Sequence, residues 1–308
     1  MGKIAFVFAG QGAQASGMGK ELYESNDAAR LVFEMADKLR PGTSNQCFYA
    51  SRDELSQTIN TQPCLFIMDL ACAAALCDAG VKPDGAAGFS LGEVAAVSFC
   101  GMLTYEEGFA LVLKRAEYMD ECALKNEGAM AAVLKLDNLL VEELCKKTGV
   151  YPVNYNCPGQ LVAAGTKHGI QMLLKLVSEN GGKAIMLPVS GAFHSPFMEE
   201  AADRLLKVLI NLNINDPAIS IYSNVTAKPY GGNAAELLAK QVNSPVLWQK
   251  TIENMITDGF DTFVEVGAGK TLSSLIRKIS EEVRVFNVEN NDSLKATADA
   301  LKGRTICC

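Results

Sequence analysis

The sequence predicts an α/β fold with a largely parallel sheet. Short apolar runs, typical of buried strands, alternate with longer helical patterns, and this alternation favours parallel strands joined by helices. One apolar run leads into a serine flanked by glycines, which is typical of a sharp turn between a strand and a helix. The middle of the chain follows another order, β-α-β-β-α-β, which indicates a small second domain.

The main body of the fold is predicted from the two ends of the chain. Ile4–Ala9 is a short, continuous apolar run that is typical of a buried strand. Gln62–Ala79 is rich in Ala, Leu and Cys and is long enough for a buried helix. In chain order, the remaining elements are a strand at Gly85–Phe89, helices at Glu93–Phe99 and Tyr105–Leu124, a strand at Thr262–Val266 and a helix at Leu272–Ile279.

Residues 127–189 are predicted to form a small inserted subdomain, because their elements follow the order of a ferredoxin-like split unit. These elements are strands at Met130–Leu136, Val150–Tyr155, Gln160–Ala164 and Lys183–Val189, with helices at Val141–Lys147 and Gly169–Asn180. The main domain then consists of residues 1–126 and 190–308. A cleft between main domain and insert is the expected substrate site.

The bulk properties of the chain exclude several classes of function. The chain has 308 residues, 49% of them hydrophobic, which suffices for one large domain with an insert. Its formal net charge of −7 argues against non-specific nucleic-acid binding as the main activity. No apolar run approaches the roughly 20 residues that span a bilayer, and the start of the chain has no signal-peptide layout. We therefore expect a cytoplasmic protein with no nucleic-acid or membrane partner.

The cysteines predict neither a metal site nor a disulfide framework. The chain has ten cysteines, and no two of them form a C-x-x-C pair. Reduced thiols in the cytoplasm are the simpler interpretation. We expect no metal site.

The most informative motif is Gly88-Phe89-Ser90-Leu91-Gly92-Glu93, which reads G-x-S-x-G. A turn of this kind presents a serine hydroxyl at the carboxyl end of a sheet, and its glycines let strand and helix approach closely. Ser90 is therefore the candidate nucleophile of an α/β-hydrolase-like main domain. Leu91 follows it, at the position that usually supplies an oxyanion-hole amide.

A serine nucleophile needs a base, and the chain has only two histidines. His168 lies in a polar turn before a predicted helix, where a solvated loop histidine is the better interpretation. His194 lies just after the last strand of the predicted insert, where the chain returns to the main domain. A neutral imidazole there would take the Ser90 proton and later return it to a leaving group.

Two glycine-rich segments resemble parts of nucleotide-binding motifs. Gly10-Gln11-Gly12 follows the first strand, but no acidic residue ends a following strand as a dinucleotide fingerprint requires. Its amides would suit an oxyanion hole instead. Gly267-Ala268-Gly269-Lys270-Thr271 resembles the end of a phosphate loop, but Val264 stands where the first glycine is needed, which excludes nucleotide hydrolysis.

Arg115 lies in a predicted helix, where a solvated side chain is the default. Its neighbours are apolar, which indicates partial burial. A buried guanidinium needs a partner such as a carboxylate, and a substrate carboxylate would serve if no internal acid does.

Taken in order, the motifs resemble those of malonyl-CoA:acyl carrier protein transacylases, and the resemblance covers nearly the whole chain. The matching segments are Gly10–Gln14, Gly88–Glu93, Lys114-Arg115, Asn154–Gln160, Ala192–Pro196, Gln241–Val246 and Glu265–Lys270.

The resemblance implies a malonyl transfer through an ester on Ser90, with His194 as the base. It implies that Gln11 and Leu91 supply the oxyanion-hole amides and that Arg115 binds the malonyl carboxylate. A backbone carbonyl at Gln241 would orient the histidine in place of an acid. The implied partners are malonyl-CoA and acyl carrier protein, with no cofactor beyond the CoA thioester of the substrate, and we expect a monomer.

Three positions can be compared with the residues that the family usually has there. Phe89 stands where the family turn usually has a histidine, and Ala268 replaces a usual proline. We expect activity to survive the change at Phe89, because the nucleophile and the oxyanion hole remain. Phe193, before the base, resembles malonyl-selective members, in which a bulky ring disfavours a methylmalonyl group.

Two other functions compete with the transacylase. A serine hydrolase would use an acid after the turn and a histidine near the C-terminus, which is disfavoured because His194 is the last histidine. A non-catalytic scaffold that binds carrier protein is disfavoured by the intact Ser90, His194 and Arg115.

Overall fold

The structure is a computed structural model that describes residues 2–189 and 191–302. These residues form two compact units. Unit 1 takes its described residues from Met1–Leu113, Ile214–Ile221 and Ile256–Cys308, and unit 2 from Lys114–Asn213 and Tyr222–Met255. Each unit is described by itself.

Unit 1 is built on a five-stranded sheet with the order β7-β2-β1-β8-β9. β1 lies at the centre and pairs in parallel with β2 and β8, and β8 pairs in parallel with β9. β1, β2 and β8 are almost wholly buried, as expected of parallel strands covered on both faces. The strands are β1 (Lys3–Phe8), β2 (Gly85–Gly88), β7 (Ser220–Tyr222), β8 (Phe260–Val266) and β9 (Arg284–Val288).

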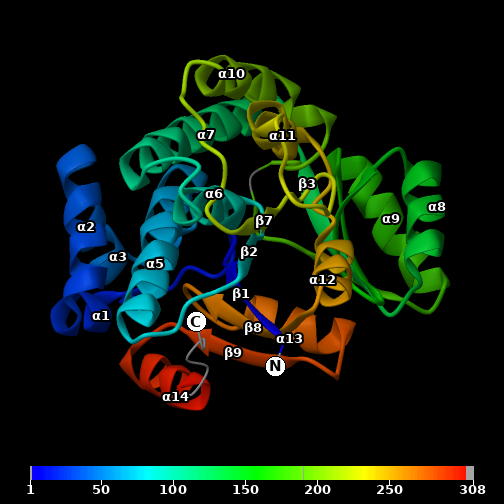
Figure 1. Cartoon of the computed structure of the whole chain (residues 1–308). Coiled ribbons are helices and arrows are strands. Elements are labelled where there is room, and N and C mark those ends of the chain that lie inside the picture. The colour runs from blue at the N-terminus through cyan, green and yellow to red at the C-terminus, as the bar shows by residue number, and fades with distance from the viewer. Residues whose placement is uncertain (1, 190, 303–308) are drawn as a thin grey trace. The chain divides into compact units, whose positions relative to one another are not determined.

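Helices cover this sheet, and in Figure 1 α2, α3 and α5 lie side by side. α2 begins at a clear sequence signal, because the Asn26 side chain accepts from the Ala29 amide and caps the helix. The helices of unit 1 are α1 (Lys20–Ser25), α2 (Asp27–Leu39), α3 (Thr43–Tyr49), α4 (Arg52–Leu55), α5 (Thr58–Asp78), α6 (Leu91–Phe99), the first part of α7 (Tyr105–Lys125), α13 (Thr271–Ile279) and α14 (Asn291–Leu301).

Helix α5 is the central helix of unit 1. Residues 61–73 of this helix are all buried, and it contacts both α2 and α6. Among the described residues it is also the one helix whose length and composition would allow it to cross a membrane. Because 89% of its most apolar window is buried within the protein, it matches the core helix of a soluble protein.

Unit 2 contains a four-stranded sheet with the order β4-β5-β3-β6, whose pairs are all antiparallel. The apolar faces of α8 and α9 pack with this sheet in one core that includes Val133, Leu144, Leu161 and Leu173. The elements are β3 (Ala129–Leu134), α8 (Asn138–Thr148), β4 (Tyr151–Cys157), β5 (Gln160–Gly165), α9 (Lys167–Glu179) and β6 (Lys183–Met186).

The rest of unit 2 is helical. It contains the second part of α7, four complete helical elements and most of a fifth, α12. These are η1 (Pro196–Met198), α10 (Glu199–Leu209), α11 (Ala234–Lys240), η2 (Gln241–Asn243) and α12 (Trp248–Thr257).

The sequence predictions for the fold class and for each named element are confirmed at the coarse level. The structure contains a parallel sheet and a small antiparallel sheet, and each predicted strand and helix is present with ends that shift by a few residues. The largest shift is at the helix expected over Gln62–Ala79, which begins at Thr58, and the strand expected over Lys183–Val189 ends at Met186.

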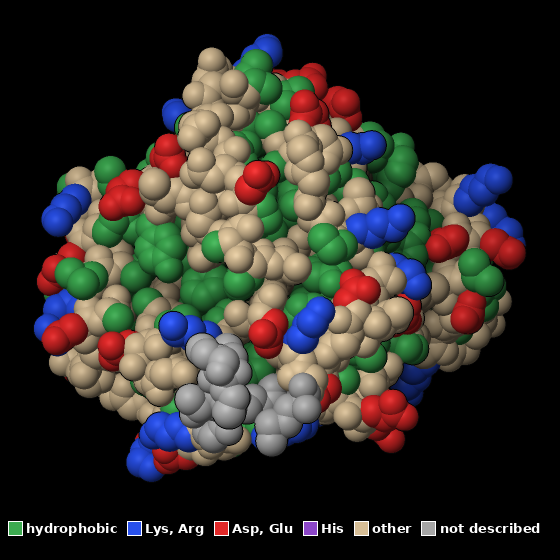
Figure 2. All heavy atoms as spheres, in the orientation of Figure 1, with side chains coloured by type: hydrophobic (Ala, Val, Ile, Leu, Met, Phe, Trp, Pro, Cys, Tyr) green, Lys and Arg blue, Asp and Glu red, His purple; other side chains and the backbone are tan. Residues whose placement is uncertain are grey.

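Acidic and basic side chains are interspersed on the face that Figure 2 shows, rather than gathered by sign.

Candidate active site

Ser90 lies on a strained turn between β2 and α6. Its backbone has φ 54° and ψ −107°, a conformation that a residue with a side chain rarely adopts. A Cβ atom at Gly88 would collide with the backbone of Gly92 and Glu93, so only glycine fits there. The strand–turn–helix context predicted for the G-x-S-x-G motif is therefore confirmed.

The loop after β1 packs directly against this turn. A Cβ atom at Gly10 would lie 2.5 Å from the carbonyl oxygen of Phe89, and one at Gly92 would lie 2.6 Å from that of Ala9. Gln11 follows in the same loop and is half-buried. Leu91 is the first residue of α6, and the first amides of a helix have no partner within it. Unit 1 thus places two sources of backbone amides, the loop and the start of α6, around the Ser90 turn.

Phe89, which departs from the family pattern, is part of the same contact. Its amide donates to the Phe8 carbonyl over 3.0 Å, and its ring lies 2.9 Å from the position that a Gly10 Cβ atom would take. The aromatic ring therefore packs on the Gly10 turn.

His194 lies in unit 2, and two backbone hydrogen bonds fix its orientation. Its Nδ1 lies 2.9 Å from the Gln241 carbonyl oxygen, and its own amide donates to Val242 over 3.2 Å. A carbonyl only accepts hydrogen bonds, so the Nδ1 of the neutral ring carries the proton. The Nε2 atom is then a proton acceptor, as a general base requires.

The environment of His194 keeps its imidazole neutral. Burial, followed by the positive charge of Arg115, lowers the pKa of His194 to about 4. Backbone groups of Gln241 and Ser244 oppose this shift because they favour the charged ring. At neutral pH the histidine is therefore a base ready to accept a proton.

Arg115 lies on α7 and is fully buried, with 1% of its surface exposed. It is therefore more deeply buried than its apolar neighbours in the sequence indicate. Its Nη2 donates to the Gln241 Oε1 over 2.8 Å. Gln241 therefore binds the arginine with its side chain and the histidine with its backbone. The structure brings these three predicted residues together in unit 2, and it places Ser90, Leu91 and Gln11 together in unit 1.

His168 is an exposed residue in the first turn of α9, which fits the solvated histidine expected there. The described residues contain no group of three or more His, Cys, Asp or Glu side chains arranged to hold a metal ion.

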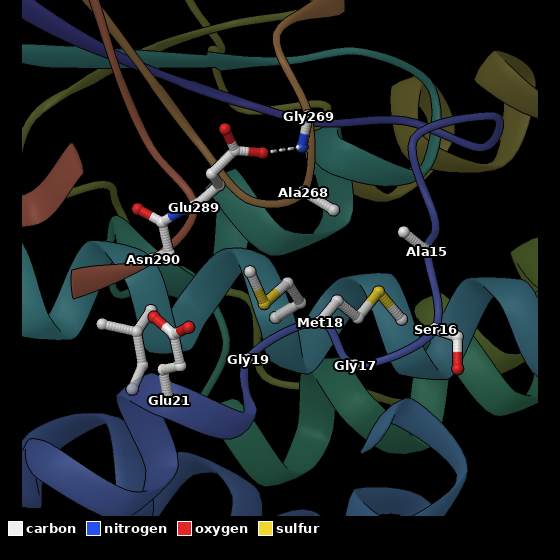
Figure 3. Close-up of a pocket in the computed structure, with 12 residues that line it drawn as sticks. Ala15, Ser16, Gly17, Met18, Gly19, Glu21, Ala268, Gly269, Glu289 and Asn290 are labelled. Carbon is white, nitrogen blue, oxygen red and sulfur yellow. Dashed lines mark hydrogen bonds between the residues drawn. The ribbon is translucent and has the colours of Figure 1, made fainter. Parts of the chain in front are cut away.

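The glycine segment after β8 is closed by a carboxylate rather than open to a phosphate. The Gly269 amide donates to Glu289 over 3.0 Å, as Figure 3 shows, and Lys270 pairs with the same carboxylate over 3.3 Å. The loops after β1, β8 and β9 line a pocket of about 230 Å³ here. Gln11, Ser90 and Leu91 are not among its lining residues.

One fully buried acidic residue is not among the residues that the sequence singled out. Asp69 interrupts the apolar sequence of α5 and is completely buried. The signal that could have found it is an acidic side chain in the middle of a helix predicted to be buried, because a buried carboxyl group needs a specific environment.

Comparisons with known proteins agree with one another. A family model described as an acyl transferase domain matches residues 5–295. The malonyl CoA-acyl carrier protein transacylase of Bacillus subtilis is 39% identical over 98% of this chain and 98% of its own length. The protein of the same name from Staphylococcus aureus is 35% identical over 96% of this chain and 98% of its own length.

Solved structures give the same result. The crystal structure of malonyl CoA-acyl carrier protein transacylase from Clostridium perfringens has a TM-score of 0.93 and 38% sequence identity. The match covers 97% of each chain. The fold and the sequence thus point to the same group of proteins.

Proposed function

Because the chain belongs to the malonyl-CoA:acyl carrier protein transacylase family of acyl transferases, we propose that it transfers a malonyl group from malonyl-CoA to the phosphopantetheine thiol of acyl carrier protein in fatty acid synthesis. The observation that carries this proposal is the pairing of His194 with the Gln241 carbonyl, because it makes Nε2 the basic nitrogen. Ser90, on its strained turn, is the nucleophile.

In the first half-reaction, the Ser90 Oγ attacks the thioester carbon while His194 Nε2 takes the hydroxyl proton. The carbonyl oxygen becomes an oxyanion, which the amides of Gln11 and Leu91 stabilise. The carbon–sulfur bond then breaks, and the CoA sulfur leaves with the proton from the imidazolium. A malonyl ester on Ser90 remains.

In the second half-reaction, the phosphopantetheine thiol of acyl carrier protein attacks the ester carbon after giving its proton to His194. The ester bond breaks, and the imidazolium returns the proton to Ser90 Oγ. The enzyme is restored, and it needs no redox or metal step in this sequence.

Arg115 is the proposed binding group for the free malonyl carboxylate. Its guanidinium is buried, where a charge attracts an opposite charge more strongly than it does in water. Gln241 holds its Nη2 in place, and a planar guanidinium can bind a carboxylate through two parallel hydrogen bonds. This contact would select malonyl over acetyl thioesters.

The finer description of the fold supports the same assignment. The serine turn between β2 and α6 favours an α/β-hydrolase-like main domain. The order β3-α8-β4-β5-α9-β6, with the sheet order β4-β5-β3-β6, favours a ferredoxin-like insert over residues 127–189, with 1–126 and 190–308 as the main domain. We place the protein in the cytoplasm as a monomer.

The test is the mass of the intact protein after exposure to malonyl-CoA alone. We expect one malonyl group on the wild-type chain and none on Ser90→Ala, and we expect the label to move to acyl carrier protein when it is added. An unlabelled wild type, or a labelled Ser90→Ala, would contradict the proposal. Release of malonate faster than transfer would instead favour a serine hydrolase, and carrier binding without labelling would favour a scaffold.

Arg115→Ala tests the carboxylate contact separately. We expect this variant to lose malonyl transfer far more than acetyl transfer, because only malonyl carries the second carboxylate. Equal losses for the two thioesters would exclude the role of Arg115.

A further inference from the structure

Asp69 places a carboxyl group in the most apolar part of unit 1. Its exposed fraction is 0%, and its neighbours Met68 and Leu70 in α5 are buried as well. Neither carboxyl oxygen makes a hydrogen bond of normal geometry with another described residue. A buried polar group without such a bond costs free energy of folding, so stability alone gives no reason for an acid at this position.

The carboxyl group lies where β1 and β8 separate. The last residues paired between these strands are Phe8 and Val266. Gly267 follows β8 with φ 126°, and a Cβ atom there would collide with Asp69 Oδ1 and lie 3.0 Å from the Ala9 Cβ. The Ala9 amide, just beyond the paired part of β1, also faces the carboxyl group. Asp69 therefore occupies the space between Gly267 and Ala9.

Ala9 connects this space to the serine turn. On its other side the Ala9 carbonyl lies against Gly92, and the next residue, Gly10, lies against Phe89. Phe89 and Gly92 flank Ser90 and Leu91 in the sequence. A displacement of the Ala9 backbone would therefore also displace the loop that follows it and the serine turn that it contacts, because these backbone segments are closely packed.

The charge state of Asp69 matters for an oxyanion. Burial, followed by the nearby Glu265 carboxylate, raises the pKa of Asp69 well above its ordinary value. Cys72, one turn along α5, and Glu265 on β8 are the other titratable groups that face it. Burial and the Glu265 charge both favour the uncharged acid over the carboxylate, so they oppose a negative charge behind the amides of the loop.

We propose that Asp69 is a positioning residue for the oxyanion hole. Its carboxyl group fills the space between Gly267 and Ala9 and holds the loop of Ala9–Gly12 against the Ser90 turn. The inference rests on the proposed function, because it assigns the loop amides to the oxyanion.

The test compares Asp69→Ala, which empties the space, with Asp69→Asn, which keeps its shape without a charge. The measurements are the rate of Ser90 labelling by malonyl-CoA, its half-saturating concentration, and the thermal midpoint of each protein. For Asp69→Ala we expect the maximal rate to fall about tenfold or more, because a misplacement of about 1 Å costs up to roughly 100-fold in rate. The half-saturating concentration and the thermal midpoint should not worsen, and Asp69→Asn should restore most of the rate.

Cys64→Ala is the control, because it also shortens a fully buried side chain of α5, and Cys64 contacts Gln46 instead of the space around Asp69. We expect it to label at the wild-type rate. Wild-type labelling by Asp69→Ala, or an equal loss in Asp69→Asn, would overturn the proposal for Asp69. Failure of the proposed function is a different result, since the wild-type chain itself would then remain unlabelled.

Discussion

His194 shows how a single residue acquires its chemistry from its surroundings. A histidine in water has a pKa of about 6.5 and would be partly protonated near neutral pH. Burial and the Arg115 charge lower the pKa of His194 to about 4, while the Gln241 carbonyl fixes the proton on Nδ1. The residue therefore needs no acidic partner to work as a base.

This environment predicts an unusual dependence of the rate on pH. Protonation removes the base, so the rate of Ser90 labelling should stay level through the mildly acidic range and fall only as the pH drops through about 4. Rapid labelling after a pH jump, with circular dichroism to confirm the fold, checks this. In Arg115→Ala, measured with acetyl-CoA, the fall should move to higher pH because the repelling charge is gone. A wild-type fall centred near the ordinary histidine value would contradict the assignment.

The folding free energy should follow the same proton. Above pH 6.5 His194 is neutral in both the folded and the unfolded chain. As the pH falls from 6.5 towards about 4, His194 binds a proton in the unfolded chain but stays neutral in the folded protein. This residue therefore lowers the free energy of unfolding over that pH range.

Gln241 predicts a separation between malonyl and acetyl substrates. Gln241→Glu keeps the side-chain shape but pairs a negative charge with Arg115, which then competes with the malonyl carboxylate. We expect the half-saturating concentration of malonyl-CoA to rise about tenfold or more, since a hydrogen bond to a charged group is worth roughly 1.5–3 kcal/mol. Acetyl transfer should persist because the backbone carbonyl that orients His194 remains, and equal losses for both substrates would argue against this role.

At the scale of elements, the serine turn depends on the absence of a side chain at Gly88. A methyl group there meets the backbone of Gly92 and Glu93, which cannot move aside as a flexible side chain would. We expect Gly88→Ala to lower the free energy of unfolding by at least about 3 kcal/mol and to abolish labelling of Ser90. Urea unfolding and intact mass measure the two effects.

Gly232→Ala is the matched control, because its Cβ position meets no atom within 4 Å. This variant should change stability by less than about 0.5 kcal/mol. A Gly88→Ala protein as stable as this control would contradict the close packing of the turn.

Elements were predictable where one local pattern dominates. The buried run of β1, the long apolar helix α5 and the alternating insert all show their type in a short window of sequence. β7 has only three residues, and β9 is mostly half-buried with a charged first residue. Neither strand therefore shows a clear hydrophobic pattern in the sequence. Glu34 and Asp37 lie in a helical pattern of the sequence, and Asn26 supplies a cap signal that would also have predicted where α2 begins.

Across the whole molecule, the burial of the cysteine thiols shows how closely the chain is packed. The eight cysteines among the described residues are all unbridged, and seven of them are buried, with Cys77 the exception. Burial raises the pKa of Cys77 to about 11 and those of Cys100 and Cys145 to about 12. Reactive thiolate is therefore scarce in the folded protein.

These thiols predict a simple labelling result. Because Cys307 and Cys308 lie outside the described residues, the experiment uses a chain in which both are replaced by serine. We expect no thiol to react quickly with Ellman's reagent in the native protein at neutral pH and all eight to react in urea. A thiol that reacts natively at the rate of a free thiol would show that a buried cysteine is accessible.

The class of fold, the serine turn and the small set of candidate residues were predictable from the amino-acid sequence, because they depend on patterns between neighbouring residues. Two histidines left one candidate base, and the ordered motifs pointed to one family. The contacts of Gln241 with both His194 and Arg115, and the contact of Asp69 with Gly267, are visible only in the folded chain. Those contacts join residues far apart along the chain, and a local period carries no information about which distant segments the fold brings together.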